Sequence, residues 1–429
     1  MELTMDCNCQ LYSTYIQILE KELATAMGCT EPIAVAYCAA KARETLGRMP
    51  ERVIVEVSGN IIKNVKSVVV PNTDGRRGLS VAAAVGIVAG DASRELEVIS
   101  SVTEKQREEL ASFLENTEIT VVPAKTDLVL DIRIYVYAGD DEAVVRIKNH
   151  HTGIALIMHN GEVLYDAEPV NPAESGTLDY GVLSVKDIYD FATTVDIDDV
   201  KDLLDHQIKC NTAIAEEGMK NNYGANVGKV LLRSYGDNVQ TRARAMAAAG
   251  SDARMSGCEM PVVINSGSGN QGITVSVPVI EYAKEWKSSR DRLYRALVLS
   301  NLIAIHLKKG MGRLSAFCGA VSAATAAGAA IAYLGGGDLK VVNHTLVNSL
   351  AIASGIVCDG AKASCAAKIA SSLDAALTGY YMYKEGQQFY ANDGIIFKGV
   401  ENTIDSVSEM VRDGMKSTDD KIIEIMTRC

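Results

Sequence analysis

The pattern of hydrophobic and polar positions changes twice along the chain, and its first part is helical. Apolar residues recur with helical spacing from Leu11 to Arg43, with one interruption at the run MGCTEP, residues 27–32. Glycine permits an unusual turn there, and proline suits the first position of a helix. The sequence therefore predicts two helices joined by a short junction.

The second part of the pattern is strand-like. Val53, Val55 and Val57 fall on one face of a predicted strand, and residues 132–137 repeat this alternation of apolar and polar positions. Alternation of this kind is typical of strands with one face in water. A helical pattern and three further strand-like runs complete this part, at residues 79–96, 143–147, 154–158 and 163–165.

The third part is helical almost to the end of the chain. It opens with a capping-box pattern at residues 183–187 and is interrupted by two glycine-rich loops, residues 265–272 and 335–337. We therefore expect an α+β fold, in which a large helical domain contains an inserted α/β domain. The predicted divisions are a helical segment, an α/β domain and a helical catalytic domain, at residues 1–47, 48–180 and 181–429.

The composition and net charge of the chain indicate which kinds of partner it can bind. The 54 acidic and 42 basic residues give a net charge of -12, which disfavours binding to nucleic acid or to an anionic membrane surface. The N-terminal run MELTMDCNCQ lacks the features of a secretory signal, and the small apolar stretch at residues 319–334 is too short to span a bilayer. We therefore expect a cytoplasmic protein whose partner is a small molecule.

Three of the ten cysteines form a candidate metal-binding set. Cys358 follows Cys318 by 40 residues, and Cys365 follows Cys358 by seven. In an unbroken helix the last two Cα atoms would lie about 10 Å apart, but the Asp-Gly pair after Cys358 predicts a turn that brings them closer. The alternative is that these are small core residues between alanine-rich helices. No Cys-x-x-Cys pair supports structural zinc.

Cys29 and the loop at residues 265–272 are candidates for catalysis and substrate binding. Cys29 stands at a predicted helix start, where the helix dipole favours a thiolate. By contrast, Cys38 has the surroundings of a core residue. The glycine-rich loop offers backbone N–H groups with serine and asparagine side chains, which suit a carboxylate or a phosphate. It lacks the Lys-Ser/Thr ending of a P-loop and the dinucleotide fingerprint, so no nucleotide is implied.

Six runs of sequence together resemble one known family. They are MGCTEPIAVAY, NNYGANVGKVL, AAAGSDARMSG, CEMPVVINSGSGNQGITVSVPVI, GRLSAFCGAVSAATAAGAA and SGIVCDGAKASCAAK. The chain resembles the L-cysteine desulfidase family, including its uncharacterised bacterial members, over nearly its whole length. It is more distantly similar to the α chains of iron–sulfur L-serine dehydratases, in which the last cysteine spacing is longer.

The resemblance implies an oxygen-sensitive lyase that converts L-cysteine to sulfide, ammonia and pyruvate. It implies a [4Fe–4S] cluster held by only three cysteines, Cys318, Cys358 and Cys365, with one iron left open as a Lewis acid. It also implies that Cys29 accepts the α-proton of the substrate. Loop chemistry adds Ser266, Ser268, Asn270 and Gln271 as ligands of the substrate carboxylate, and the α/β domain offers Asn60, His151 and Thr152 as further candidates.

Several alternatives stay open at this point. The same open iron could eject hydroxide, which would make the chain an L-serine or L-threonine dehydratase. A redox or iron sensor is a second alternative, although a sensor needs neither Cys29 nor a carboxylate-binding loop. Cys429 at the chain end is a candidate to cap the open iron at rest, against the ordinary fraying of chain ends. Assembly as a homodimer is also left open.

Overall fold

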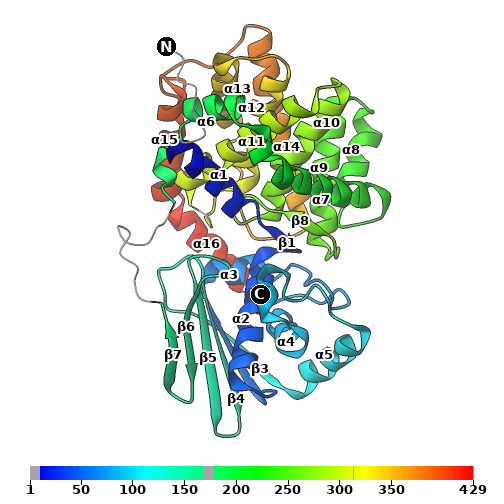
Figure 1. Ribbon diagram of the computed structural model, residues 1–429, viewed down its shortest axis with the longest axis vertical. Helices are drawn as coiled ribbons and strands as arrows, with labels where there is room; N and C mark the ends of the chain where they lie inside the picture. The colour runs from blue at the N-terminus through cyan, green and yellow to red at the C-terminus, as the bar shows by residue number, and fades with distance from the viewer. Residues whose placement is uncertain (1–9, 168–177, 313, 429) are drawn as a thin grey trace.

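The computed structural model describes residues 10–167, 178–312 and 314–428. Figure 1 shows two parts, an α/β layer and a larger helical body. The six-stranded sheet lies at the end of the molecule away from the helical body. The expected α+β fold is confirmed. No helix within the described residues is long and apolar enough to cross a membrane.

The sheet of the α/β layer has the strand order β3-β2-β4-β5-β6-β7. Strands β2 and β3 are parallel, and the remaining pairs are antiparallel. In β2 and β4 buried residues alternate with more exposed ones, so this part of the sheet has the wet face that the sequence predicts. The strands are β2 (Arg52–Val57), β3 (Glu118–Pro123), β4 (Asp131–Ala138), β5 (Asp141–Lys148), β6 (Ile154–His159) and β7 (Glu162–Asp166).

Helix α2 (Thr30–Leu46) covers the apolar face of the sheet and packs against β4, β5 and β6. Its alanine-rich middle lets α4 approach closely, since Gly86 of α4 lies against the backbone of Ala36. The domain division remains a proposal, and residues 30–46 fall spatially with the α/β layer rather than with the helical body. The other helices of this layer are α3 (Gly59–Val65), α4 (Leu79–Ala89), η1 (Ala92–Glu97) and α5 (Glu104–Asn116).

The helical body is built around α10, α11 and α12, whose residues are mostly buried. Helix α12 has no charged residue, and its Gly328 lets it pack directly on Ala376 of α14. The helices of this body are α1 (Gln10–Glu22), α6 (Val185–Thr194), α7 (Lys201–Lys220), α8 (Val227–Tyr235), α9 (Val239–Met255), α10 (Gly269–Glu285), α11 (Arg290–Met311), α12 (Gly319–Leu334), α13 (Leu339–Ala353), α14 (Ser364–Lys384) and α15 (Val400–Glu409). Short 3-10 turns η2 (Tyr180–Val182) and η3 (Ile197–Asp199) flank α6.

The last helix returns to the α/β layer. After the π-helical turn η4 (Met410–Gly414), α16 (Lys416–Thr427) packs against α3. There the Nζ atom of Lys63 donates to the carboxylate of Asp419, and the lysine is 1% exposed. The last helix is therefore joined to the α/β layer. Cys429 lies outside the described residues.

Four local predictions can be compared with the structure. The predicted helix start is confirmed, because Ser184 is the N-cap of α6 and its side chain accepts a hydrogen bond from the backbone N–H of Asp187. The helical pattern at residues 79–96 divides at Gly90 into α4 and η1. The loop predicted at residues 265–272 ends at residue 268, because α10 begins at Gly269. The junction after α1 contains a short strand, β1 (Thr25–Met27), which pairs with β8 (Pro261–Val263).

Candidate active site

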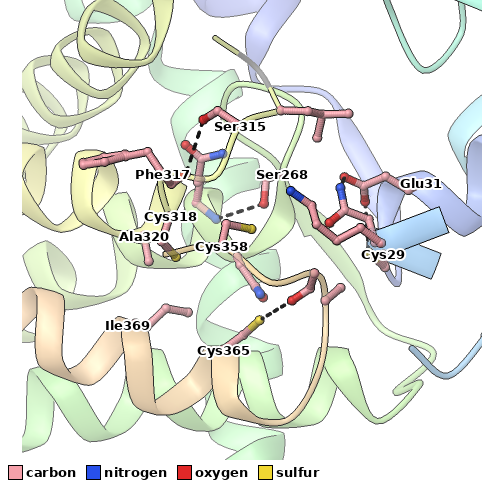
Figure 2. A pocket seen from close by; sticks show the side chains of 18 of the residues that line it. Cys29, Glu31, Ser268, Ser315, Phe317, Cys318, Ala320, Cys358, Cys365 and Ile369 are labelled. Atoms are coloured by element: carbon pink, nitrogen blue, oxygen red, sulfur yellow. Dashed lines mark hydrogen bonds between the residues drawn. The ribbon is translucent and has the colours of Figure 1, made fainter. Parts of the chain in front are cut away.

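A cavity of about 100 Å³ lies where the α/β layer meets the helical body. Residues of both layers line it, and Figure 2 shows two groups of side chains. We call Cys318, Cys358 and Cys365 the thiol side of the cavity. We call Cys29, Glu31, Lys63 and Asn64, which come from α2, α3 and the residue before α2, the polar side.

A backbone bridge places the first two thiols side by side. Phe317 and Val357 form an isolated antiparallel β-bridge. Within it the N–H of Cys318 donates to Ile356 at 3.0 Å, and the N–H of Cys358 donates to Ala316 at 2.6 Å. The 40-residue separation of these cysteines in sequence is thus closed by main-chain hydrogen bonds.

A turn brings the third thiol to the same cavity. Gly360 has a φ of 88°, a conformation that glycine adopts without strain, and α14 begins four residues later. Cys365 is the second residue of α14, and its Sγ lies 3.6 Å from the carbonyl oxygen of Gly360. The turn that the sequence predicts between Cys358 and Cys365 is confirmed.

Burial and mutual proximity raise the pKa values of these thiols. Burial, followed by the neighbouring Cys358, raises the pKa of Cys318 to about 12. Burial likewise raises the pKa of Cys365, and Cys358 adds to the shift. Without a bound cation both groups are therefore thiols at neutral pH. Metal binding would displace their protons, because a metal takes up the thiolate form.

The donor set on the thiol side consists of three thiols that line one cavity, which is the ligand chemistry of an iron–sulfur cluster. Among the described residues, no three His, Cys, Asp or Glu side chains are grouped closely enough to hold one metal ion. In a four-iron cluster each thiolate binds its own iron, so the sulfurs stand further apart. Cys318 is the N-cap of α12 and Cys365 lies in the first turn of α14. Both helix N-termini favour negative charge at the sulfurs.

The polar side is organised by the carboxylate of Glu31. The Sγ–H of Cys29 donates to Oε2 of Glu31 at 3.0 Å, and the hydroxyl of Thr30 donates to the same oxygen at 3.1 Å. The amide of Asn64 donates to Oε1 at 3.3 Å. A hydrogen-bonded pair of a thiol and a carboxylate therefore faces the cavity.

Cys29 is the N-cap of α2, as its place in the sequence predicts, but its ionisation differs from the simple expectation. Burial, followed by the negative charge of Glu31, raises the pKa of Cys29 well above its usual range. The positive charge of Arg254 acts in the opposite direction but is outweighed. The helix start therefore does not suffice to hold a thiolate here.

The predicted carboxylate-binding residues divide between two places. Ser268, the N-cap of α10, lines the cavity together with Asn270 and Gln271. The Oδ1 atom of Asn270 and the Oε1 atom of Gln271 are buried without a hydrogen-bond partner in the described structure. Ser266 lines a neighbouring cavity instead, with His150 and Lys308.

The three candidates on the α/β layer do not line the main cavity. His151 is buried, and its Nε2 atom lies 4.0 Å from Oε1 of Glu31, behind the polar side. Asn60 is buried in the first turn of α3. Thr152 is half-buried beside His151. Their roles remain predictions.

Sequence reasoning missed several charged residues of the cavity. Glu31 and Arg254 both stand in the runs MGCTEPIAVAY and AAAGSDARMSG, where charged residues are embedded among small and apolar ones. Such embedding predicts burial, and a buried charge needs a specific partner or role. Lys63 and Lys308 were also missed, because each stands in a mixed run of apolar and polar residues in which a lysine is ordinarily exposed.

The comparisons with known proteins identify the family of the chain. The family model of the serine dehydratase alpha chain matches residues 93–424. The chain therefore belongs to the serine dehydratase alpha chain family, which suggests a lyase-type enzyme. The relationship predicted from the sequence is confirmed at this level.

Bacterial relatives cover almost the whole chain. A UPF0597 protein of Desulfitobacterium hafniense is 56% identical over 415 residues, which are 97% of this chain and 96% of the relative. One from Lachnoclostridium phytofermentans is 51% identical over 416 residues, 97% of this chain and 100% of the relative. One from Vibrio parahaemolyticus is 39% identical over 425 residues, 97% and 99% of the two chains. The sequence similarity thus covers nearly the full length of both chains in each comparison.

Proposed function

We propose that this chain is an iron–sulfur-dependent lyase that converts L-cysteine to sulfide, ammonia and pyruvate. The observation that carries the proposal is one cavity with three thiols on one side and the Cys29–Glu31 pair on the other. Three thiols suit a cluster, and the thiol–carboxylate pair suits removal of a proton. A β-elimination needs both functions within reach of one small substrate.

Cys318, Cys358 and Cys365 would hold the cluster. A [4Fe–4S] cluster with three protein ligands has one open iron, which supplies a Lewis acid for the leaving group. The protein's own contribution on this side is to fix the three sulfurs through the Phe317–Val357 bridge and the turn at Gly360. The helix N-termini at Cys318 and Cys365 stabilise the negative charge of the thiolates.

Cys29 and Glu31 would remove the α-proton of the substrate. Glu31 accepts the hydrogen bond of the thiol, so its carboxylate is placed to take the thiol proton. The resulting Cys29 thiolate removes the proton from the α-carbon, the Cβ–S bond breaks, and sulfide leaves. The product 2-aminoacrylate tautomerises to an imine, which water hydrolyses to pyruvate and ammonia. Ser268, Asn270 and Gln271 offer polar groups to the substrate's carboxylate end.

A second candidate function is the dehydration of L-serine or L-threonine. The family model with the description serine dehydratase alpha chain favours it. The same residues would act, with water leaving in place of sulfide. L-Cysteine remains our first choice, because a soft thiolate suits an iron site and because the junction at Cys29 resembles the desulfidases.

Anaerobic reconstitution tests the proposal. The full chain is loaded with iron and sulfide, freed of excess reagent, and assayed in parallel for sulfide and pyruvate from L-cysteine and for pyruvate from L-serine and L-threonine. We expect a brown protein with the highest kcat/KM for L-cysteine. A higher kcat/KM for L-serine would establish the dehydratase instead. A loaded protein that turns over none of the three would contradict both enzymatic functions.

A further inference from the structure

Arg254 brings a buried positive charge to the cavity. It is the penultimate residue of α9, lines the cavity, and is 2% exposed. Its side chain forms no hydrogen bond or ion pair with any residue that the structure describes, and its Nε atom is buried without a partner. Burial of an unpaired guanidinium is costly, so proteins retain one where an anion is to be bound.

A second positive group lies against this guanidinium. Helix α10 begins at Gly269, and a Cβ atom at that position would collide with Nε and Cζ of Arg254. The absence of a side chain therefore brings the helix N-terminus, with its partial positive charge, directly onto the cation. Two like charges in contact in a poorly hydrated place repel each other unless an anion lies between them.

The described chain does not supply this anion. Glu31 is the acidic residue that lines the cavity, and its oxygens already accept hydrogen bonds from Cys29, Thr30 and Asn64. Asp252 is two residues from Arg254, but its carboxylate accepts from the backbone at the start of α8 instead. The counter-charge of Arg254 is thus expected to come from a bound molecule.

We propose that Arg254 binds the α-carboxylate of the substrate, and that Gly269 is required for this contact. The proposal rests on the proposed function for the identity of the ligand as an amino acid. A carboxylate matches a guanidinium through two parallel hydrogen bonds, and the N–H groups of α10 add further donors. The cavity of about 100 Å³ suits a ligand as small as an amino acid.

The position of Arg254 also orients the reacting carbon. Arg254 and Cys29 line the same small cavity. The α-carbon is bonded directly to the carboxylate. A carboxylate on Arg254 therefore holds the α-proton near Cys29 and directs the β-substituent to the thiol side, which lies across the cavity (Figure 2). Arg254 would select amino acids with a free carboxylate.

The first test uses cluster-free protein and needs no turnover. Calorimetric titration compares L-alanine, which has the carboxylate but no leaving group, with L-alaninamide, which lacks the negative charge. We expect the wild-type protein to bind L-alanine more tightly. Arg254→Gln should lose about 10- to 100-fold in affinity for L-alanine, the contribution of a charge-assisted bidentate contact. Gly269→Ala should also weaken binding, because the added methyl group displaces the guanidinium.

Two variants control for folding and charge. Arg254→Lys keeps the charge but loses the paired geometry, so its affinity should lie between those of wild type and Arg254→Gln. Arg244→Gln removes a cation from the same helix whose partner is Asp374, outside the cavity, and should bind L-alanine like wild type. Equal affinity of wild type and Arg254→Gln for L-alanine, or no preference of wild type for L-alanine over L-alaninamide, would overturn the proposal.

A second measurement separates this proposal from the proposed function. In the reconstituted protein, Arg254→Gln should raise KM for L-cysteine while its iron content stays at the wild-type level. If iron is lost and the preference for L-alanine remains, Arg254 balances the charge of the cluster and our assignment is wrong. If the reconstituted wild type has no lyase activity but cluster-free protein binds L-alanine through Arg254, the lyase proposal fails and the carboxylate site stands.

Discussion

The two sides of the cavity are fixed by different kinds of interaction. On the polar side, side chains bond to side chains: Glu31 accepts from Cys29, Thr30 and Asn64, and Lys63 pairs with Asp419. On the thiol side, the main chain does the positioning through the bridge at Phe317 and the turn at Gly360.

This difference has a consequence for substitutions. Exchanging a cysteine on the thiol side leaves the backbone in place, so the change removes a ligand rather than the local fold. Exchanging a residue on the polar side alters a hydrogen-bond network. The change therefore modifies proton transfer and leaves the three cysteines of the thiol side in place. Variants of the two sides are therefore expected to separate cofactor binding from chemistry.

The largest effect is expected on the thiol side. Cys365→Ser should lose both the cluster iron and the activity, because serine is a poor ligand for iron and two thiols do not retain the cluster. Iron and acid-labile sulfide analysis of anaerobically purified protein measures the loss. Cys258→Ser is the matched control, since Cys258 is half-buried and does not line the cavity. A fully loaded Cys365→Ser protein would show that this residue is not a ligand.

The next effect concerns Cys29 on the polar side. Cys29→Ser should keep its iron and brown colour but lower kcat by about 10²- to 10⁴-fold, because a hydroxyl is a far weaker proton acceptor than a thiolate. Cys38→Ser serves as the control. Cys38 lies on the same helix in the core, with its Sγ 3.3 Å from the carbonyl of Val145. A colourless Cys29→Ser protein would place Cys29 among the cluster ligands and reverse the two roles.

A third variant acts where the two sides meet. Gly360 has positive φ, and a Cβ atom there would collide with the carbonyl group of Lys63. Gly360→Ala should therefore destabilise the fold by about 1–3 kcal/mol through backbone strain and reduce iron retention. Thermal unfolding and iron content measure both effects. Gly355→Ala in the same connection is the control, because no atom lies within 4 Å of the added methyl group. Equal Tm values for the two variants would contradict this account.

The smallest effect is a shift in pH dependence. Burial and then Glu31 raise the pKa of Cys29, so activity that requires the thiolate should rise with pH. Glu31→Gln removes the negative neighbour, which lowers the pKa of Cys29 and moves the rising limb of the kcat/KM profile to lower pH. Because Glu31 also accepts the thiol proton, we expect about a tenfold lower maximum. If the rising limb of the kcat/KM profile stays at the same pH in Glu31→Gln, Glu31 does not influence the pKa of Cys29.

Much of the fold followed from local sequence patterns. Alternation at Val53, Val55 and Val57 predicted β2, and Ser184 marked the start of α6. The parallel strand β3 and the pairing of β1 with β8 were not predicted, because they depend on partners far away in the sequence. Local periodicity also could not predict that α2 packs on the sheet. The helix is buried on nearly all sides, so its sequence shows no single apolar face.

The candidate site was predictable only in part, for a similar reason. Cys29, Cys318, Cys358 and Cys365 were selected by residue type and spacing, and the structure brings all four to one cavity. Arg254 was not selected, because nothing in its neighbourhood marks it as unpaired. Its proposed role depends on two features of the tertiary structure. Gly269 lies against its guanidinium, and Glu31 is hydrogen-bonded to other residues.

The contact between Lys63 and Asp419 links positions 356 residues apart, beside the cavity. A ribosome releases the N-terminal part of a chain first, so Lys63 emerges long before its partner helix exists. Cys29, Cys318, Cys358 and Cys365 emerge before that helix too, and until then Lys63, which lines the same cavity, lacks its partner. If the proposed cluster is bound, we therefore expect its insertion to follow translation, and the nascent thiols to need protection from oxidation while the last helix is being made.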